Sequence, residues 1–194
     1  RHGTSRHANP QPLYTEEDAR QTLKHFRKVG YKTRTVLPGK MEFEFQMAGH
    51  ILGSAFAHIY FEDGTNVLMG GDLGPYDAPL INDPTPIPYA DYLVLESTYG
   101  DRLHPEEDTE GALEEIFQEA FREGRTVIVP SFAIGRTQEL LYYISRLQVR
   151  GAMPRIPIFL DSPMAVTATQ LYDRSVEEYD QDMKEMVAAV LSTL

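Results

Sequence analysis

A histidine and an aspartate lie in two glycine-rich segments that each follow a segment with the pattern of a strand. His50 lies in residues 49–54 (GHILGS), and Asp72 lies in residues 70–74 (GGDLG). Glycine lets the backbone bend and approach closely, so an imidazole or a carboxylate can be aimed at a metal ion. Taken alone, each is better explained as a side chain hydrogen-bonded within its own turn. Taken together they form a candidate metal site, because neighbouring strand ends can face one cleft.

The donor set for a metal is restricted, because the sequence contains no cysteine. Disulfides and thiolate sites are therefore excluded, and any metal must be held by histidine, aspartate or glutamate. The other histidines are weaker candidates. His58 lies within a strand-like segment and is explained by packing. The remaining ones have no metal-like spacing: His2, His7, His25 and His104.

Glu96 is a candidate catalytic residue because it follows a short apolar segment, residues 92–95, and precedes residues 97–102 (STYGDR). In open α/β sheets, residues that bind ligands gather at the carboxyl ends of the strands. The alternative is a salt bridge between Glu96 and Arg102.

Residues 130–137 (PSFAIGRT) join an apolar segment to a helical one and suggest a substrate-binding loop. Ser131 and Thr137 offer hydroxyl groups and Arg136 a guanidinium group, which together suit a phosphate at a helix N-terminus. Simple helix capping explains the same residues equally well.

The elements that must position these residues change character near residue 90. Before it, apolar residues alternate from Met41, and Asp63-Gly64 separates two strand-like segments as in a hairpin. After it, apolar strands at 92–95, 126–129 and 156–160 alternate with helical segments at about 109–124 and 135–149, which is typical of parallel βαβ units. A further helix, from the N-cap Thr15 to about Val29, is expected near the beginning.

Composition excludes several classes of protein. The 194 residues are 42% hydrophobic and 24% charged, which is typical of a globular chain. The apolar runs are too short for a membrane helix, and no leader peptide is recognisable at the beginning. The net charge of −11 argues against a broad nucleic-acid-coating surface, but leaves room for a narrow groove. The absence of cysteine fits a cytoplasmic location.

Four segments carry a resemblance to one family, and they occur in its order and spacing: residues 48–54, 71–74, 96–100 and 130–141. Residues 12–19 also resemble the bacterial members of that family. The chain resembles the β-CASP proteins of the metallo-β-lactamase superfamily, which include the endonuclease that cleaves pre-mRNA 3′ ends and its bacterial and archaeal relatives. The resemblance implies an α/β fold. Residues 1–90 would form part of an αββα metallo-β-lactamase sandwich, and residues 91–194 part of an inserted, Rossmann-like β-CASP domain with parallel strands.

The resemblance also implies roles for three residues. His50 would be a zinc ligand, Asp72 the aspartate that bridges two zinc ions, and Glu96 the acidic residue that supports a catalytic histidine of a later motif. The family's His-x-His-x-Asp-His signature is absent, so it is expected upstream of Arg1, and two later histidines are expected downstream of Leu194. The chain is thus expected to be an internal piece that is inactive by itself.

The function implied is that of a zinc-dependent ribonuclease in RNA processing or decay, using two zinc ions, with RNA as its partner and no membrane association. Two alternatives are a non-catalytic β-CASP scaffold subunit and a small-molecule hydrolase of the metallo-β-lactamase fold. The sequence does not decide between endonuclease and exonuclease action or between RNA and DNA as the preferred substrate. It also leaves open the sequence specificity and the oligomeric state, and a homo-oligomer is one possibility.

Overall fold

The computed structural model describes residues 12–87, 89–104, 108–181 and 183–184. It contains two compact units, Arg1–Gly30 and Tyr31–Leu194. The residues predicted for the site belong to the second unit: His50, Asp72, Glu96, Ser131, Arg136 and Thr137. His2 and His7, which are weaker candidates, lie outside the described residues. The division predicted near residue 90 remains a prediction.

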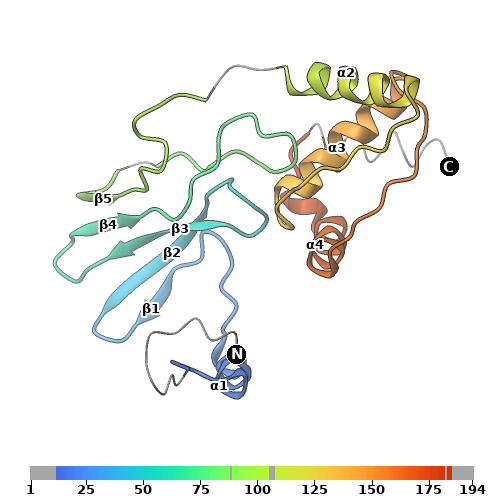
Figure 1. Ribbon diagram of the computed structural model, residues 1–194. Coiled ribbons are helices and arrows are strands. Elements are labelled where there is room, and N and C mark those ends of the chain that lie inside the picture. The colour runs from blue at the N-terminus through green and yellow to red at the C-terminus, as the bar shows by residue number, and fades with distance from the viewer. Residues whose placement is uncertain (1–11, 88, 105–107, 182, 185–194) are drawn as a thin grey trace. The chain divides into compact units, whose positions relative to one another are not determined.

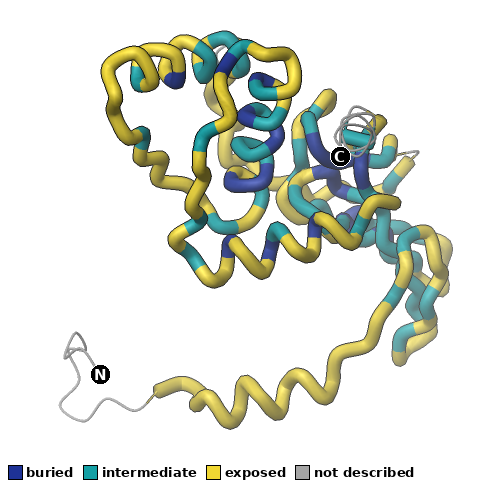
Figure 2. The backbone as a smooth tube through the Cα atoms, turned by 90° about the vertical axis from the view of Figure 1, so that its right-hand side faces the viewer, coloured by how far each residue is buried: buried dark blue, intermediate teal, exposed yellow. Residues whose placement is uncertain are grey.

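The first unit contains one short helix, α1 (Glu16–Thr22), followed by a 3-10 turn, η1 (Leu23–His25). Thr15 caps α1 as predicted, and its hydroxyl accepts a hydrogen bond from the Asp18 amide. The expected continuation to about Val29 is wrong, because Phe26 already has an extended backbone. Every residue of α1 is exposed (Figure 2), so no packed face extends the helix beyond its capped first turns.

The second unit begins with a five-stranded sheet in the order β1-β2-β3-β4-β5 (Figure 1). The strands are β1 (Thr35–Leu37), β2 (Met41–Met47), β3 (Ala55–Tyr60), β4 (Asn66–Met69) and β5 (Tyr92–Val94). The first four are antiparallel neighbours, whereas β5 runs parallel to β4. The predicted hairpin is confirmed, and the Asp63 carboxylate accepts the Thr65 amide in its turn. The parallel step from β4 to β5 is made by the long proline-containing loop that follows Gly70.

The fully buried residues of the sheet lie on the face opposite to the alternating apolar side chains of β2. Phe56 pairs with Gln46 and Leu68 pairs with His58, so these four side chains share one face. Phe56 and Leu68 form a buried cluster with Ala48. The face that carries the β2 apolar residues is only partly buried.

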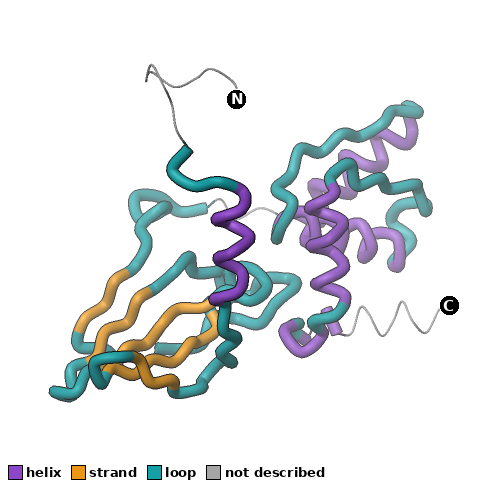
Figure 3. The backbone as a smooth tube through the Cα atoms, turned by 90° about the horizontal axis from the view of Figure 1, so that it is seen from below, coloured by secondary structure: helices purple, strands orange, loops and turns teal. Residues whose placement is uncertain are grey.

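Three helices follow the sheet: α2 (Thr109–Arg122), α3 (Arg136–Val149) and α4 (Pro163–Asp173), and a 3-10 turn, η2 (Val176–Glu178), comes after them. Figure 3 shows these helices gathered apart from the strands. Helices α2 and α3 pack around Phe117, Ile144 and Leu147. Glu110 of α2 also forms an ion pair with Arg146 of α3 at 3.1 Å. None of the helices in the described ranges is long and apolar enough to cross a membrane.

The mixed α/β class is confirmed, but two of the three predicted parallel strands are not formed. Residues 126–129 and 156–160 are irregular, and β5 is exposed at every residue rather than buried. A strand exists only where a neighbouring backbone supplies hydrogen bonds, and no described segment pairs with these two. Their apolar side chains remain uncovered, and Ile128 and Phe159 are both 87% exposed.

The sheet and the helices of the second unit meet at the loop between β4 and β5. Leu80 and Ile81 of this loop pack against Tyr142, Tyr172 and Tyr179 in one buried cluster. A bridge of antiparallel β type joins Ile81 to Tyr179. The loop is therefore held by the helical segment, and its first residues include Asp72.

Candidate metal centre

His50 lies in the tight loop between β2 and β3, and the backbone of this loop explains its glycines. Gly49 and Gly53 have φ values of 65° and 77°, in the left-handed region that favours glycine. The Ser54 hydroxyl accepts the His50 amide at 3.0 Å and the Ile51 amide at 3.2 Å. These two bonds hold the loop in a closed turn, and the His50 side chain remains partly exposed.

Asp72 lies in the loop that follows β4, and the backbone of this loop contacts the backbone of the His50 loop. The Gly74 amide donates to the Ala48 carbonyl at 2.9 Å. A Cβ at Gly74 would overlap the carbonyl group of Gly49. Glycine at position 74 is therefore required for the two loops to approach this closely.

The consequence is that His50 and Asp72 face each other. His50 Nε2 lies 3.9 Å from Asp72 Oδ2, and the two side chains are 42% and 74% exposed. Ligand atoms of a tetrahedral zinc lie about 3.4 Å apart, since each bond is about 2.0–2.1 Å long. The pair fits two positions of such a site after a movement of about half an ångström. Among the described residues, no third histidine, aspartate or glutamate completes a group of three.

Glu96 bonds to the Asp72 loop and not to Arg102. Its Oε1 accepts the Leu73 amide at 2.9 Å, and its Oε2 accepts the Thr98 hydroxyl at 2.7 Å. Hydrogen bonds from Thr98 and then Leu73 hold the pKa of the Glu96 carboxyl below its ordinary value, with a smaller contribution from His50. Arg102 lies beside Asp101 at 3.7 Å. Glu96 is therefore a carboxylate that fixes the backbone next to Asp72.

The three predicted phosphate-binding residues lie together at the start of α3, but local bonds use most of their groups. The Thr137 hydroxyl donates to the Phe132 carbonyl at 2.7 Å and lies 3.4 Å from the Ser131 hydroxyl. The Thr137 amide also donates to the Phe132 carbonyl. Arg136 is 67% exposed and pairs with Glu139. The guanidinium of Arg136, rather than the helix amides, is the group available to a phosphate here.

His58 is a buried, hydrogen-bonded histidine, as its position in a strand predicts. Its Nε2 lies 2.9 Å from the Asn66 side-chain oxygen, and its Nδ1 lies 2.9 Å from the Tyr60 hydroxyl. Both ring nitrogens therefore have protein partners.

The sequence gives no sign of three residues that contact the His50 loop. The Leu52 amide donates to the Tyr172 hydroxyl at 3.3 Å, and the Tyr31 hydroxyl donates to the Ser54 carbonyl at 3.1 Å. The Gly53 amide favours the ionised form of the Glu178 carboxyl, so these two groups also lie close together. Tyrosines are read from sequence as packing residues, and more than a hundred positions separate Tyr172 and Glu178 from the loop that they contact.

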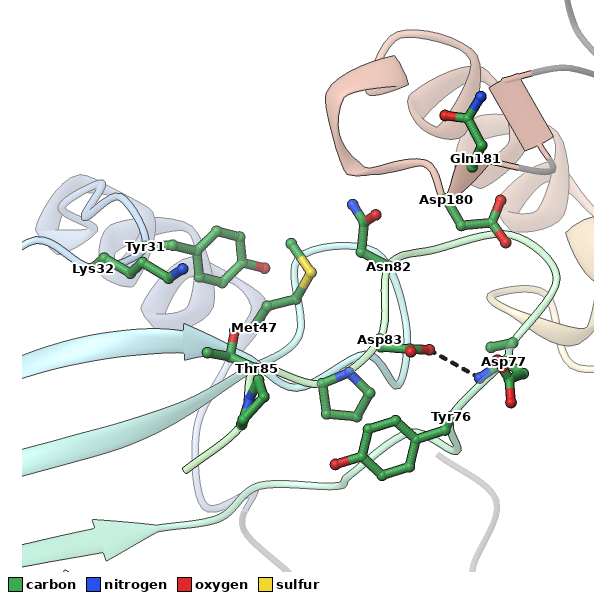
Figure 4. A pocket seen from close by; sticks show the side chains of 13 residues that line it. Tyr31, Lys32, Met47, Tyr76, Asp77, Asn82, Asp83, Thr85, Asp180 and Gln181 are labelled. Carbon is green, nitrogen blue, oxygen red and sulfur yellow. Dashed lines mark hydrogen bonds between the residues drawn. The ribbon is translucent and has the colours of Figure 1, made fainter. Parts of the chain in front are cut away.

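Tyr31 also lines a cavity of about 890 Å³, which Figure 4 shows from close by. Its lining includes Tyr31, Met47, Asn82, Asp83 and Asp180. None of the predicted site residues lines it, so it is not the candidate metal centre.

Comparison with known proteins gives matches over most of the chain. The sequence profile of the Beta-Casp domain matches residues 137–193. A protein of Thermus thermophilus named ribonuclease TTHA0252 is 36% identical over 175 residues, which cover 90% of this chain and 40% of that protein. An RNase J-like protein of Methanocaldococcus jannaschii is 35% identical over 179 residues, covering 90% and 42%.

A third relative is the transcription termination factor FttA of Thermococcus kodakarensis. It is 30% identical over 183 residues, which cover 91% of this chain and 28% of that protein. The chain thus spans about two fifths or less of the length of these relatives.

Proposed function

The chain belongs to the β-CASP family of metallo-β-lactamase-fold proteins, and from this we propose that the protein is a zinc-dependent phosphodiesterase that hydrolyses RNA. The observation that carries the proposal is the approach of His50 Nε2 to Asp72 Oδ2, at 3.9 Å, on two loops joined at Gly49 and Gly74. Two of the compared relatives are named as a ribonuclease and as an RNase J-like protein, which supports RNA as the substrate.

In this proposal, His50 binds zinc through Nε2 and Asp72 binds it through its carboxylate. When bound, two zinc ions would activate a water molecule and stabilise the charge that develops on the attacked phosphate. Asp72 would help to hold the zinc ions, because its carboxylate offers two oxygens and a negative charge. The remaining ligands would come from residues other than these two, since the described residues offer no third one in the group.

In this proposal, Glu96 contributes to the site by holding the Asp72 loop in place. Its bonds to the Leu73 amide and the Thr98 hydroxyl keep the carboxylate ionised and fix the backbone that carries Asp72. This arrangement is compatible with the proposed support of a later histidine, because a carboxylate oxygen can accept more than one hydrogen bond. Arg136 contributes a cation at the start of α3 that can contact a phosphate of the substrate chain.

The test is hydrolysis of end-labelled, single-stranded RNA by the complete gene product. The protein is treated with a chelator, dialysed, and supplied with zinc or with magnesium. We expect loss of hydrolysis in the chelated protein and recovery with zinc. DNA of the same sequence, and a lactam or thioester substrate, are tested in parallel. Hydrolysis that survives complete metal removal, or activity on the small substrates alone, would contradict the proposal.

A further inference from the structure

Three residues of the His50 loop interact with the helical segment or with Tyr31. The Leu52 amide donates to the Tyr172 hydroxyl of α4 at 3.3 Å. The Gly53 amide lies near the carboxylate of Glu178, the last residue of η2, and favours its ionised form. The Ser54 carbonyl accepts the Tyr31 hydroxyl at 3.1 Å. Three consecutive residues of the loop, beginning two positions after His50, are therefore held from outside.

Tyr172 is itself rigidly placed. Its side chain is 5% exposed and belongs to the buried cluster that also contains Leu80 and Tyr179. The Tyr179 hydroxyl donates to the Tyr172 carbonyl at 2.5 Å. The Tyr172 hydroxyl thus projects from the core of the helical segment to the Leu52 amide.

Glu178 is placed by its backbone. Its carbonyl accepts the Asn82 amide at 3.2 Å and the Asn82 side-chain nitrogen at 3.1 Å. Asn82 belongs to the loop between β4 and β5, which begins near Asp72. Glu178 therefore connects the His50 loop, through Gly53, to the same loop that carries Asp72.

We propose that Tyr172 and Glu178 are positioning residues for His50, and that they set the affinity of the centre for zinc from the helical segment. The proposal rests on the proposed function, because it takes His50 as a zinc ligand. With glycine at positions 49 and 53, the loop would sample many conformations if only the bonds to Ser54 held it. The Tyr172 hydroxyl and the Glu178 carboxylate reduce the number of these conformations. The loop therefore loses less conformational entropy when the metal binds.

The chain offers variants that separate position from folding. Tyr172→Phe removes the hydroxyl acceptor and keeps the ring in the core. Glu178→Ala removes the acceptor for Gly53, whereas Glu178→Gln keeps an oxygen there. Glu177→Ala is the matched control, because Glu177 is an exposed carboxylate in the same short turn.

The experiment uses the complete protein and two kinds of measurement. In the metal-free state, hydrogen exchange of the Leu52 and Gly53 amides and the NMR resonances of the His50 ring are followed. Zinc affinity is then measured by competition with a chelating dye, and thermal unfolding of the metal-free variants is recorded beside it.

We expect faster exchange of Leu52 in Tyr172→Phe and of Gly53 in Glu178→Ala, with shifted His50 ring resonances in both. Zinc affinity should fall about tenfold, as it does when a group that orients a ligand is removed. Glu178→Gln should restore most of the affinity, and Glu177→Ala should match the parent protein.

Unchanged zinc affinity despite faster amide exchange would overturn the positioning role. So would a loss of affinity that only follows a loss of thermal stability and is not restored by Glu178→Gln. If the parent protein binds no zinc, the proposed function fails. The positioning proposal is then decided by the metal-free arm, and unchanged His50 resonances would overturn it.

Discussion

The backbone of Gly74 lies against that of Gly49, so closely that a methyl group at position 74 would overlap the Gly49 carbonyl. This contact joins the loop of a histidine to the loop of an aspartate without any side chain. The distance of 3.9 Å between His50 Nε2 and Asp72 Oδ2 follows from it. The approach of these two side chains therefore depends on the backbones of Gly49 and Gly74.

The Gly74→Ala variant is the direct test of this contact. The added methyl group must push the two loops apart, so the free energy of unfolding should fall by about 2–3 kcal/mol, as for overpacked sites. Zinc binding should be lost as well. Gly64→Ala is the control, since position 64 has a positive φ but open space around it. It should cost about 1–2 kcal/mol through strain alone and leave zinc affinity unchanged. Equal effects of both variants on zinc would argue against the contact.

Asp72→Asn is expected to abolish RNA hydrolysis in the complete protein and leave the fold intact. Asp72 is 74% exposed, so little packing is lost, whereas an amide cannot supply the charge that holds two cations close together. Hydrolysis rate, bound zinc and circular dichroism are measured together. Asp101→Asn, which changes another exposed carboxylate, is the control. Near-normal turnover with two bound zinc ions would remove Asp72 from the site.

Glu96→Gln is expected to slow hydrolysis more than it weakens zinc binding. Glutamine keeps an oxygen for the Leu73 amide, and its side-chain nitrogen can donate to the Thr98 hydroxyl, but the negative charge disappears. Thr98→Val removes the Thr98 bond and keeps the charge, so its effect on rate should be smaller. The measurement compares the fold decrease in the rate of RNA hydrolysis with the fold decrease in zinc affinity. Zinc that disappears in step with activity would identify Glu96 as a ligand.

The candidate pair His50 and Asp72 could be found from the sequence, because glycines on both sides indicate a bent backbone near the end of a strand. The groups that surround this pair could not be predicted from the sequence. Tyr172 and Glu178 reach the His50 loop only after the chain has passed through α2 and α3, and no local pattern encodes that return. The partners of Glu96 were also not visible in the sequence, where a salt bridge to Arg102 was only the alternative explanation. Arg102 is near in sequence, but the Leu73 amide lies at the exit of β4, next to β5 in the sheet.

The missing parallel strands have a different cause. Residues 126–129 and 156–160 have the apolar composition of buried strands, and composition reports a preference for burial. It does not supply the neighbouring backbone that a ladder requires. The helices that alternate with these segments were predicted better, because the hydrogen bonds of a helix lie within the helix itself.

Arg136→Ala is expected to weaken RNA binding and change stability little. The residue is 67% exposed, and its pair with Glu139 is a surface pair worth at most about 0.5 kcal/mol. The logarithm of the binding constant falls with the logarithm of the salt concentration, and this slope should become shallower by about one unit, as expected for the loss of one phosphate contact. Glu139→Ala breaks the same pair and keeps the cation, so it should not weaken binding. An unchanged slope with a large loss of thermal stability would make Arg136 a structural residue.

The Glu178 carboxyl is expected to make the stability of the protein depend on pH. Burial, and then the charge of Glu177, raise the pKa of the Glu178 carboxyl above its ordinary value, although the Gly53 amide and the Tyr31 hydroxyl oppose this. A raised pKa means that the folded protein binds this proton more tightly than the unfolded chain does. The stability contributed is complete below the unfolded pKa, near 4.5, and is lost as pH rises through the folded pKa.

Replacing Glu178 with glutamine removes this titration and keeps an acceptor for Gly53. The unfolding free energy of Glu178→Gln, relative to the parent, should therefore increase between pH 4 and pH 7, by less than about 1 kcal/mol because the site is only partly buried. Urea unfolding of the metal-free proteins at several pH values measures it, and groups common to both proteins cancel in the difference. Glu177→Gln removes a neighbouring charge and should flatten the profile in part. A difference that stays constant with pH, or that decreases, would mean that the Glu178 carboxylate is stabilised rather than penalised by its contacts with the His50 loop.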